Sequence, residues 1–307
     1  MGVYVAKEFP QIDWAAVEED CREIVRLAIR EDLDRDSDWT TIALIPHGAV
    51  GQADVVARHG GVIAGLTAVR TAIEESAAKL ELVTDLSDGD WIEGRQPVAT
   101  IRGSIRDLLT LERICLNLLG RMAGVATLTR SYVEAIQGRR ARLYDTRKTI
   151  PGWRRLDKYA VRCGGGHNHR WGLYGGVLIK DNHLAYAAEA GMSPAQAIER
   201  ARDVLGQALG SAAAADMIVE VEVDTEAQLR NVLPAKPDIV LLDNFTPQGL
   251  QRCVAVRNEL AAEVQLEASG GVNLATVLAI ADSGVDRISV GTLTHSAPNF
   301  DFGLDWA

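Results

Sequence analysis

Two clusters of basic side chains stand in the middle of the chain at positions suited to holding an anion. Arg147 and Lys148 lie in the segment DTRKTIPG (145–152), and His169 and Arg170 end the segment CGGGHNHR (163–170). An arginine can hold a carboxylate through two parallel N–H donors, whereas a lysine acts as a mobile point charge. Glycines before the second cluster permit close approach of the backbone to a ligand. Both segments are therefore predicted to bind an anion.

A further lysine and two carboxylates end other apolar runs. Lys180 ends the run 176–180, Glu222 ends 218–222 and Asp243 ends 238–243. A lysine at such a place suits either a Schiff-base nucleophile, as in barrel aldolases, or a charged contact to a phosphate or carboxylate. Hard carboxylate oxygens near phosphates suit Mg²⁺. We therefore expect Glu222 and Asp243 to bind Mg²⁺, directly or through water.

Glycine-rich loops and one arginine complete the set of candidate residues. Ser269, Gly270 and Gly271 follow the run 264–269, and Gly291 and His295 belong to VGTLTHS (290–296). Loops after the last strands of a parallel barrel commonly bind phosphate through backbone N–H groups. Arg113 stands on a leucine-rich segment, LTLER (109–113), where it could simply pair with Glu112.

The apolar runs that carry these residues alternate with helix-like stretches, which predicts parallel strands. The runs are 142–146, 176–180, 218–222, 238–243, 264–269 and 287–291. In a parallel barrel, the carboxyl ends of all strands open onto one face, and this face carries the chemistry. The pattern therefore predicts an α/β barrel of about six strands, with the cations and carboxylates gathered around one pocket.

The first part of the chain lacks the strand–helix rhythm and is predicted to be a separate α+β domain. We expect an amphipathic helix at 13–31, an acidic loop at 31–41, strands within 50–66 and 81–103, and a helical region at 106–137. The predicted domains are 1–120 for the α+β part and 121–292 for the barrel. The apolar tail, 293–307, is expected to pack back on the N-terminal domain.

Composition excludes several classes of protein. The net charge of −10 over 307 residues argues against a generic nucleic-acid-binding or acidic-membrane-binding surface. The four cysteines form no CxxC pair, so neither a zinc ribbon nor a disulfide framework is indicated. No apolar run approaches the about 18 residues of a membrane span, and the first ten residues carry no cleavage signal. A cytoplasmic protein is expected.

Taken together, these motifs resemble those of the quinolinate phosphoribosyltransferases, also called carboxylating nicotinate-nucleotide pyrophosphorylases. The resemblance includes the segments around Arg113, Arg147, Arg170 and Lys180, together with VEVEVD (219–224), LLDNF (241–245), EASGG (267–271) and VGTLTHS (290–296). It spans nearly the whole chain, and the order of several motifs makes it far more specific than any one of them.

The resemblance implies transfer of phosphoribose from phosphoribosyl pyrophosphate (PRPP) to quinolinate with Mg²⁺, giving nicotinate mononucleotide, CO₂ and pyrophosphate. It implies an incomplete barrel and a homodimer or larger assembly, in which Arg113 enters the site of the neighbouring subunit. Arg147, His169 and Arg170 would hold quinolinate, with Lys180 between the two substrates. Glu222 and Asp243 would lie near the ribose and the metal. The positions implied near phosphates are Lys148, Ser269, Gly270, Gly271, Gly291 and His295.

Alternatives stay open at this point. A Schiff-base aldolase would use Lys180 as its nucleophile. A molybdenum-linked group of paralogues shares the fold and many of the motifs and acts on a different substrate. A catalytically silent barrel would bind an anionic metabolite without turnover, although such a binder needs no acidic pair beside phosphate-binding loops.

Overall fold

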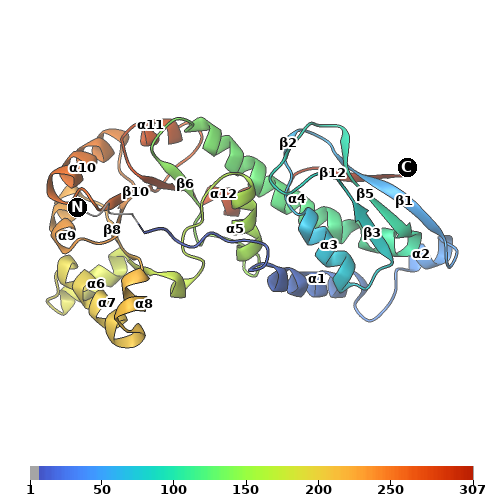
Figure 1. Cartoon of the computed structure of the whole chain (residues 1–307), viewed down its shortest axis with the longest axis horizontal. Helices are drawn as coiled ribbons and strands as arrows, with labels where there is room; N and C mark the ends of the chain where they lie inside the picture. Colours follow the sequence, from blue (N-terminus) through green and yellow to red (C-terminus); the bar gives the residue numbers. More distant parts are fainter. Residues whose placement is uncertain (1–6, 307) are drawn as a thin grey trace. The chain divides into compact units, whose positions relative to one another are not determined.

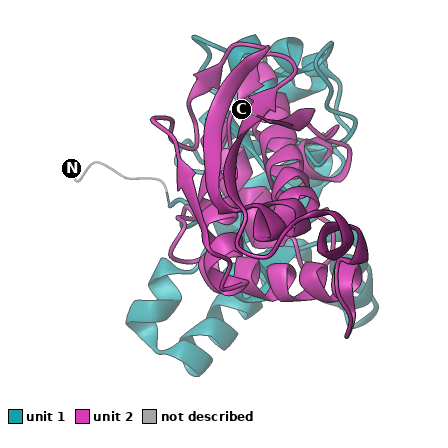
Figure 2. Cartoon of the chain, turned by 90° about the vertical axis from the view of Figure 1, so that its right-hand side faces the viewer, with its two compact units in different colours: residues 1–10, 132–147, 167–291 teal, residues 11–131, 148–166, 292–307 magenta. Residues whose placement is uncertain are grey.

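The computed structural model describes residues 7–306, and the chain divides into two compact units (Figure 2). Among the described residues, unit 1 contains 7–10, 132–147 and 167–291, and unit 2 contains 11–131, 148–166 and 292–306. The prediction that the first ten residues carry no cleavage signal includes residues 1–6, which lie outside the described residues. Each unit is assembled from separate stretches of chain. The predicted division of the chain into the domains 1–120 and 121–292 and the tail 293–307 stays a prediction.

Unit 1 is built on one parallel sheet of six strands in the order β6-β11-β10-β9-β8-β7. The strands are β6 (Arg142–Tyr144), β7 (Val177–Ile179), β8 (Val219–Val223), β9 (Ile239–Asp243), β10 (Gln265–Ser269) and β11 (Arg287–Ser289). All six expected strands form. Since β6 and β7 are the two ends of the sheet and do not pair with each other within residues 7–306, the barrel is incomplete, as predicted.

Helices cover the outside of these strands (Figure 1). They are α6 (Asp181–Glu189), α7 (Pro194–Leu209), α8 (Ser211–Asp216), α9 (Glu226–Val232), α10 (Pro247–Leu260) and α11 (Val277–Ala281). Two of them begin just after a strand at a threonine cap, where Thr225 accepts a hydrogen bond from Gln228 N and Thr246 accepts one from Gly249 N. Such caps satisfy N–H groups at a helix start, and they fix where the chain turns after β8 and β9.

Unit 2 contains an antiparallel sheet in the order β12-β1-β5-β3, formed by β1 (Val50–Ala57), β3 (Leu80–Val83), β5 (Gln96–Ser104) and β12 (Phe302–Trp306). A short ladder joins β2 (Gly61–Val62) to β4 (Trp91–Ile92). The helices are α1 (Glu18–Leu33), α2 (Trp39–Leu44), α3 (Leu66–Glu75), α4 (Ile105–Ala135), α5 (Arg154–Cys163) and α12 (Thr292–His295). Helix α1 lies beside α3 (Figure 1).

The prediction of an acidic loop over 31–41 is wrong at both ends. Helix α1 continues to Leu33, and α2 already begins at Trp39, so the connection covers only residues 34–38. The side chain of Asp38 accepts a hydrogen bond from Thr41 N and caps α2. A helix cap uses the same residue types as a polar loop, which is why the composition of this stretch suggested a loop.

The C-terminal residues are packed into unit 2. Strand β12 pairs with β1, and Phe302 is buried. Gly124 of α4 lies so close to the carbonyl oxygen of Pro298 that any Cβ at this position would meet it. The glycine therefore permits close packing, and α4 passes through it without a break. Within residues 7–306, each helix is either too short or too polar to cross a membrane.

Candidate active site

The predicted site residues divide between the two units. Unit 1 holds Arg147, His169, Arg170, Lys180, Glu222, Asp243, Ser269, Gly270, Gly271 and Gly291. Unit 2 holds Arg113, Lys148 and His295. Most of the predicted residues therefore belong to the unit that contains the parallel sheet, and they follow the carboxyl ends of its strands.

The two arginines of unit 1 are brought near each other at the open end of β6. The burial of the Arg170 guanidinium, together with the positive charge of Arg147, lowers the pKa of Arg170. The Nε atoms of both side chains are buried and have no hydrogen-bond partner among residues 7–306. Two neighbouring cations with unsatisfied donors favour binding of an anion, because burial makes both their repulsion and their unmet hydrogen bonds costly.

Asp145 holds the segment that carries Arg170. This buried residue follows β6, and its carboxylate accepts hydrogen bonds from Asn168 Nδ2 at 2.7 Å and from His169 N at 2.9 Å. The backbone of His167 forms a parallel bridge to Tyr144, so the segment runs beside β6. Sequence reasoning missed Asp145, although its position two residues before Arg147 was a usable signal.

His169 lies in the interior of unit 1 and is only 6% exposed. Its Nε2 atom is 3.0 Å from Glu220 Oε2 and 3.6 Å from Glu267 Oε1. Burial lowers the pKa of His169, but the charges of Glu220 and Glu267 outweigh it, so the net shift is upward. Arg287 donates to Glu267 Oε2 at 2.7 Å and to Glu8 Oε2 at 2.9 Å. This buried charged cluster was not predicted.

Histidine 169, Glu220 and Glu267 could hold a metal ion as far as distances are concerned, because their ligand atoms lie within 4.8 Å of one another. The hydrogen bonds of the ring argue otherwise. His169 Nδ1 accepts a hydrogen bond from Arg170 N at 2.8 Å, so the proton of a neutral ring must be on Nε2. A protonated Nε2 cannot donate its electron pair to a metal, and the cluster is better described as a histidine N–H that faces two carboxylates, beside the ion pair of Glu267 with Arg287.

Lys180, Glu222 and Asp243 form a second group at the ends of β7, β8 and β9. Lys180 Nζ is 3.8 Å from Glu222 Oε2. Glu222 and Asp243 line a cavity of about 380 Å³ together with Asp181 and Asp224. The pKa of Glu222 is raised, mainly by burial of the carboxyl group. The charge of Lys180 lowers this pKa, and the charges of Asp243 and Asp181 raise it. This group therefore has an excess of negative charge that suits a cation.

The glycine loop after β10 lies beside the end of β9. Ser269 pairs in register with Asp243, and its carbonyl oxygen accepts a hydrogen bond from Asn244 N at 2.9 Å. Gly270 has a φ of +90°, and a Cβ on it would meet the side chain of Asn244. Only glycine suits this position, both for its backbone conformation and for the space available. Gly271 is exposed next to it, and Gly291 follows β11.

The predicted residues of unit 2 are exposed. Arg113 is 66% exposed on α4, and its guanidinium is 3.9 Å from the carboxylate of Glu112. Lys148 and His295 are connected through Thr294, whose hydroxyl donates to the carbonyl oxygen of Lys148 at 2.8 Å. His295 Nδ1 is 2.6 Å from the hydroxyl oxygen of Ser296.

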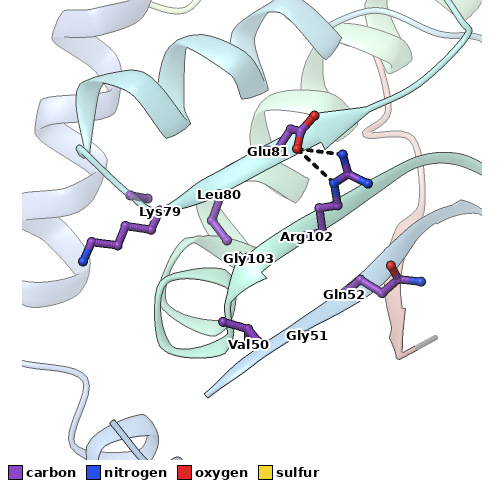
Figure 3. Close-up of a pocket in the computed structure, with 9 residues that line it drawn as sticks. Val50, Gly51, Gln52, Lys79, Leu80, Glu81, Arg102 and Gly103 are labelled. Carbon is purple, nitrogen blue, oxygen red and sulfur yellow. Dashed lines mark hydrogen bonds and ion pairs between the residues drawn. The ribbon is translucent and has the colours of Figure 1, made fainter. Parts of the chain in front are cut away.

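A larger hollow in unit 2 contains none of the predicted site residues. It has a volume of about 650 Å³, is widely open, and lies where β1 and β3 begin and β5 ends (Figure 3). Arg102 and Glu81, which line it, are joined by a hydrogen bond of 2.9 Å (Figure 3). Of the two described cations that line it, Lys79 and Arg102, the second is therefore already paired.

Known proteins match both parts of the chain. Residues 38–123 match the N-terminal domain of quinolinate phosphoribosyl transferase, and residues 125–305 match its C-terminal domain. The nicotinate-nucleotide pyrophosphorylase [carboxylating] of Mycobacterium leprae is 41% identical over 92% of this chain and 96% of its own. A probable enzyme of the same name from Bacillus subtilis is 36% identical over 83% of each chain.

A solved structure shows the same fold. The nicotinate-nucleotide pyrophosphorylase from Francisella tularensis superposes with a TM-score of 0.85 at 30% identity, covering 99% of this chain and all of that one. Family models thus match both parts of the chain, and the relatives match it over most of its length. The chain belongs to the quinolinate phosphoribosyl transferase family.

Proposed function

We propose that this chain transfers phosphoribose from PRPP to quinolinate with loss of CO₂, producing nicotinate mononucleotide and pyrophosphate for NAD biosynthesis. The names of its relatives support this reaction. The observation that carries the proposal is the pair of neighbouring arginines, Arg147 and Arg170, each with a buried Nε that has no partner among residues 7–306. A pyridine with two adjacent carboxylates supplies the charge and the acceptors that this pair requires.

The basic residues would bind and orient quinolinate. Arg147 and Arg170 each have a rigid fork of donors for a carboxylate. Lys180 is half exposed and close to Glu222, so it would reach between the pyridine and the sugar as a charged contact. Held in this way, the ring nitrogen faces C1 of the ribose, and orientation of this kind can supply much of the rate enhancement.

The carboxylates would stabilise the positive charge that develops on the ribose. Positive charge develops on the ribose as the bond from C1 to pyrophosphate breaks. Glu222 and Asp243, on the wall of a cavity rich in negative charge, would stabilise it. The ring nitrogen of quinolinate then donates its electron pair to C1 from the opposite face. When CO₂ leaves, the electron pair of the carbon–carboxylate bond stays on the adjacent ring carbon, where the positively charged nitrogen stabilises it, and this carbon then takes up a proton from water. No protein nucleophile is needed.

Glu222 and Asp243 would also bind Mg²⁺. Their oxygens are hard ligands, and the pKa of Glu222 is raised first by its burial and then by the charges of Asp243 and Asp181, which a bound cation would offset. When bound, the ion would neutralise the charge of pyrophosphate. The phosphates themselves would be held by the backbone and side chains that follow β6, β10 and β11, namely Lys148, Ser269, Gly270, Gly271, Gly291 and His295.

Arg113 would act in the site of a second copy of the chain, which makes a homodimer the smallest complete enzyme. Its guanidinium is 66% exposed, and its contact with Glu112 is long, at 3.9 Å. An exposed pair of this kind contributes little to stability, so the arginine is available for another partner. A cytoplasmic location stays a prediction.

The test is to incubate the purified protein with quinolinate, PRPP and Mg²⁺ and to measure pyrophosphate, CO₂ and nicotinate mononucleotide. Equal amounts of the three products are expected. A matched reaction with nicotinate in place of quinolinate controls for the second carboxylate and should be much slower. If a folded sample releases neither pyrophosphate nor CO₂ from quinolinate, the proposal is rejected.

A further inference from the structure

Both ring nitrogens of His169 face groups of the chain itself. Nδ1 accepts the backbone N–H of Arg170 at 2.8 Å, while Nε2 points to the interior and is 3.0 Å from Glu220 and 3.6 Å from Glu267. The hydrogen bond on one ring nitrogen determines which nitrogen carries the proton. Two carboxylates at Nε2 and an N–H group at Nδ1 both favour the same arrangement, with the proton on Nε2.

The two carboxylates are costly features of this core. Glu220 and Glu267 are both 0% exposed, and neither oxygen of Glu220 has a conventional hydrogen bond among residues 7–306. A buried carboxylate costs several kcal/mol unless nearby charges and donors compensate it. Glu267 is held by Arg287, whose other end is fixed by Glu8. Glu220 Oε2 lies 3.0 Å from His169 Nε2.

The His169 ring is also packed against an aromatic side chain, and the ring in turn holds the backbone of Arg170. The ring of Phe9 packs against the His169 ring with centroids 4.5 Å apart. Arg170 is then held at two points, by His169 Nδ1 at its backbone and by the Gly176 carbonyl oxygen at Nη1, 2.8 Å away. The position of its guanidinium therefore depends on which nitrogen of His169 is protonated.

We propose that Glu220 and Glu267 are positioning residues that keep the proton of His169 on Nε2, so that Nδ1 stays free of a proton and holds the Arg170 backbone in its binding position. The inference concerns residues that do not touch the substrate. The part that concerns quinolinate rests on the proposed function, whereas the part that concerns the histidine proton does not. The two parts are therefore tested separately.

The first test measures the proton directly. In protein labelled with ¹⁵N-histidine, the His169 signals are identified among the six histidines by their loss in His169→Asn. The spectrum is recorded above the raised pKa of His169, where the ring is neutral, and Nε2 should then show the shift of a protonated nitrogen and Nδ1 that of an unprotonated acceptor. A ring protonated at Nδ1, alone or together with Nε2, overturns the proposal. This measurement needs neither substrate nor activity.

The second test compares two variants that each remove one buried negative charge, at Glu220 in β8 and at Asp286 just before β11. Glu220→Gln should raise the KM for quinolinate about tenfold or more, the factor for one displaced charged hydrogen bond, and leave the KM for PRPP unchanged. Asp286→Asn is the control, because Asp286 is paired with buried Arg257 at 2.7 Å and is not part of the proposed site. It should lower the melting temperature without changing the KM for quinolinate.

The outcomes separate the two proposals. If the wild-type protein fails to use quinolinate, the proposed function falls, and the nitrogen shifts still decide where the proton of His169 lies. If the wild-type protein is active but Glu220→Gln has an unchanged KM for quinolinate, the positioning role is refuted. The same conclusion follows if both substrates are affected equally in Glu220→Gln, since a general loss of structure would produce that result.

Discussion

Replacing Arg147 with methionine should weaken quinolinate binding and leave the unliganded protein at least as stable as before. Arg147 contributes to the lowered pKa of Arg170, which means that the two cations repel each other in the absence of an anion. Methionine has a similar length and no charge, so the repulsion and the buried unpartnered Nε disappear together. An arginine kept for stability would behave in the opposite way.

The size of the binding effect follows from the interaction that is lost. A hydrogen bond to a charged group contributes about 1.5–3 kcal/mol, and each 1.4 kcal/mol changes a dissociation constant about tenfold. Loss of the Arg147 contact should therefore raise the Kd for quinolinate by a factor of roughly 10–150. The affinity for PRPP should change much less.

Titration calorimetry with quinolinate and thermal unfolding with and without the ligand measure both effects. Arg257→Met serves as the matched control: Arg257 is a buried arginine 2.7 Å from Asp286, and breaking such a pair costs about 3–5 kcal/mol of stability. Arg147→Met should have a normal melting temperature without quinolinate, and quinolinate should raise it only slightly. Arg257→Met should have a lowered melting temperature without quinolinate and a normal increase when quinolinate is added. A destabilised Arg147→Met protein with normal affinity would refute the reasoning.

Three further predictions concern the carboxylates and the assembly. Glu222→Gln should abolish most activity yet stabilise the protein at pH 7, because the raised pKa of Glu222 means that its charged carboxylate opposes folding. Chemical denaturation measures this gain in stability. The gain should vanish below pH 4.5, the ordinary pKa of a glutamate, where the carboxyl is protonated in both the folded and the unfolded state. Chelation by EDTA should stop product formation and Mg²⁺ should restore it, with Asp243→Asn requiring more of the ion; full activity in EDTA would argue against a metal at this site. Mixing inactive Arg113→Ala with inactive Lys180→Ala should restore part of the activity, and no recovery after proven subunit exchange would exclude a shared site.

The strands of the sheet and the residues at their ends could be predicted because both depend on short stretches of chain. Apolar runs such as 218–222 and 238–243 form strands wherever they are buried, and parallel strands bring their carboxyl ends to the same edge. The closeness of Lys180 to Glu222 and the cavity that Glu222 shares with Asp243 follow from this rule. Their roles in catalysis stay predictions.

The acidic stretch near Asp38 shows where such local reasoning fails. The same residues can form a loop or begin a helix, and the choice depends on whether the hydrogen bond from Thr41 N to Asp38 forms in the folded chain. The pairing of β12 with β1 is similar, since residues far apart in the sequence meet at one sheet edge. No sequence pattern within β12 or β1 indicates which strand it will pair with.

By itself, the sequence determined the kind of chemistry: arginines, a lysine and carboxylates at the ends of apolar strands, in an order shared with one enzyme family. Only the tertiary structure decided that His169 is enclosed by Glu220, Glu267 and Phe9. The physical reason is that strand formation and strand polarity are local properties, whereas the proton position of a buried histidine depends on charges contributed by distant strands.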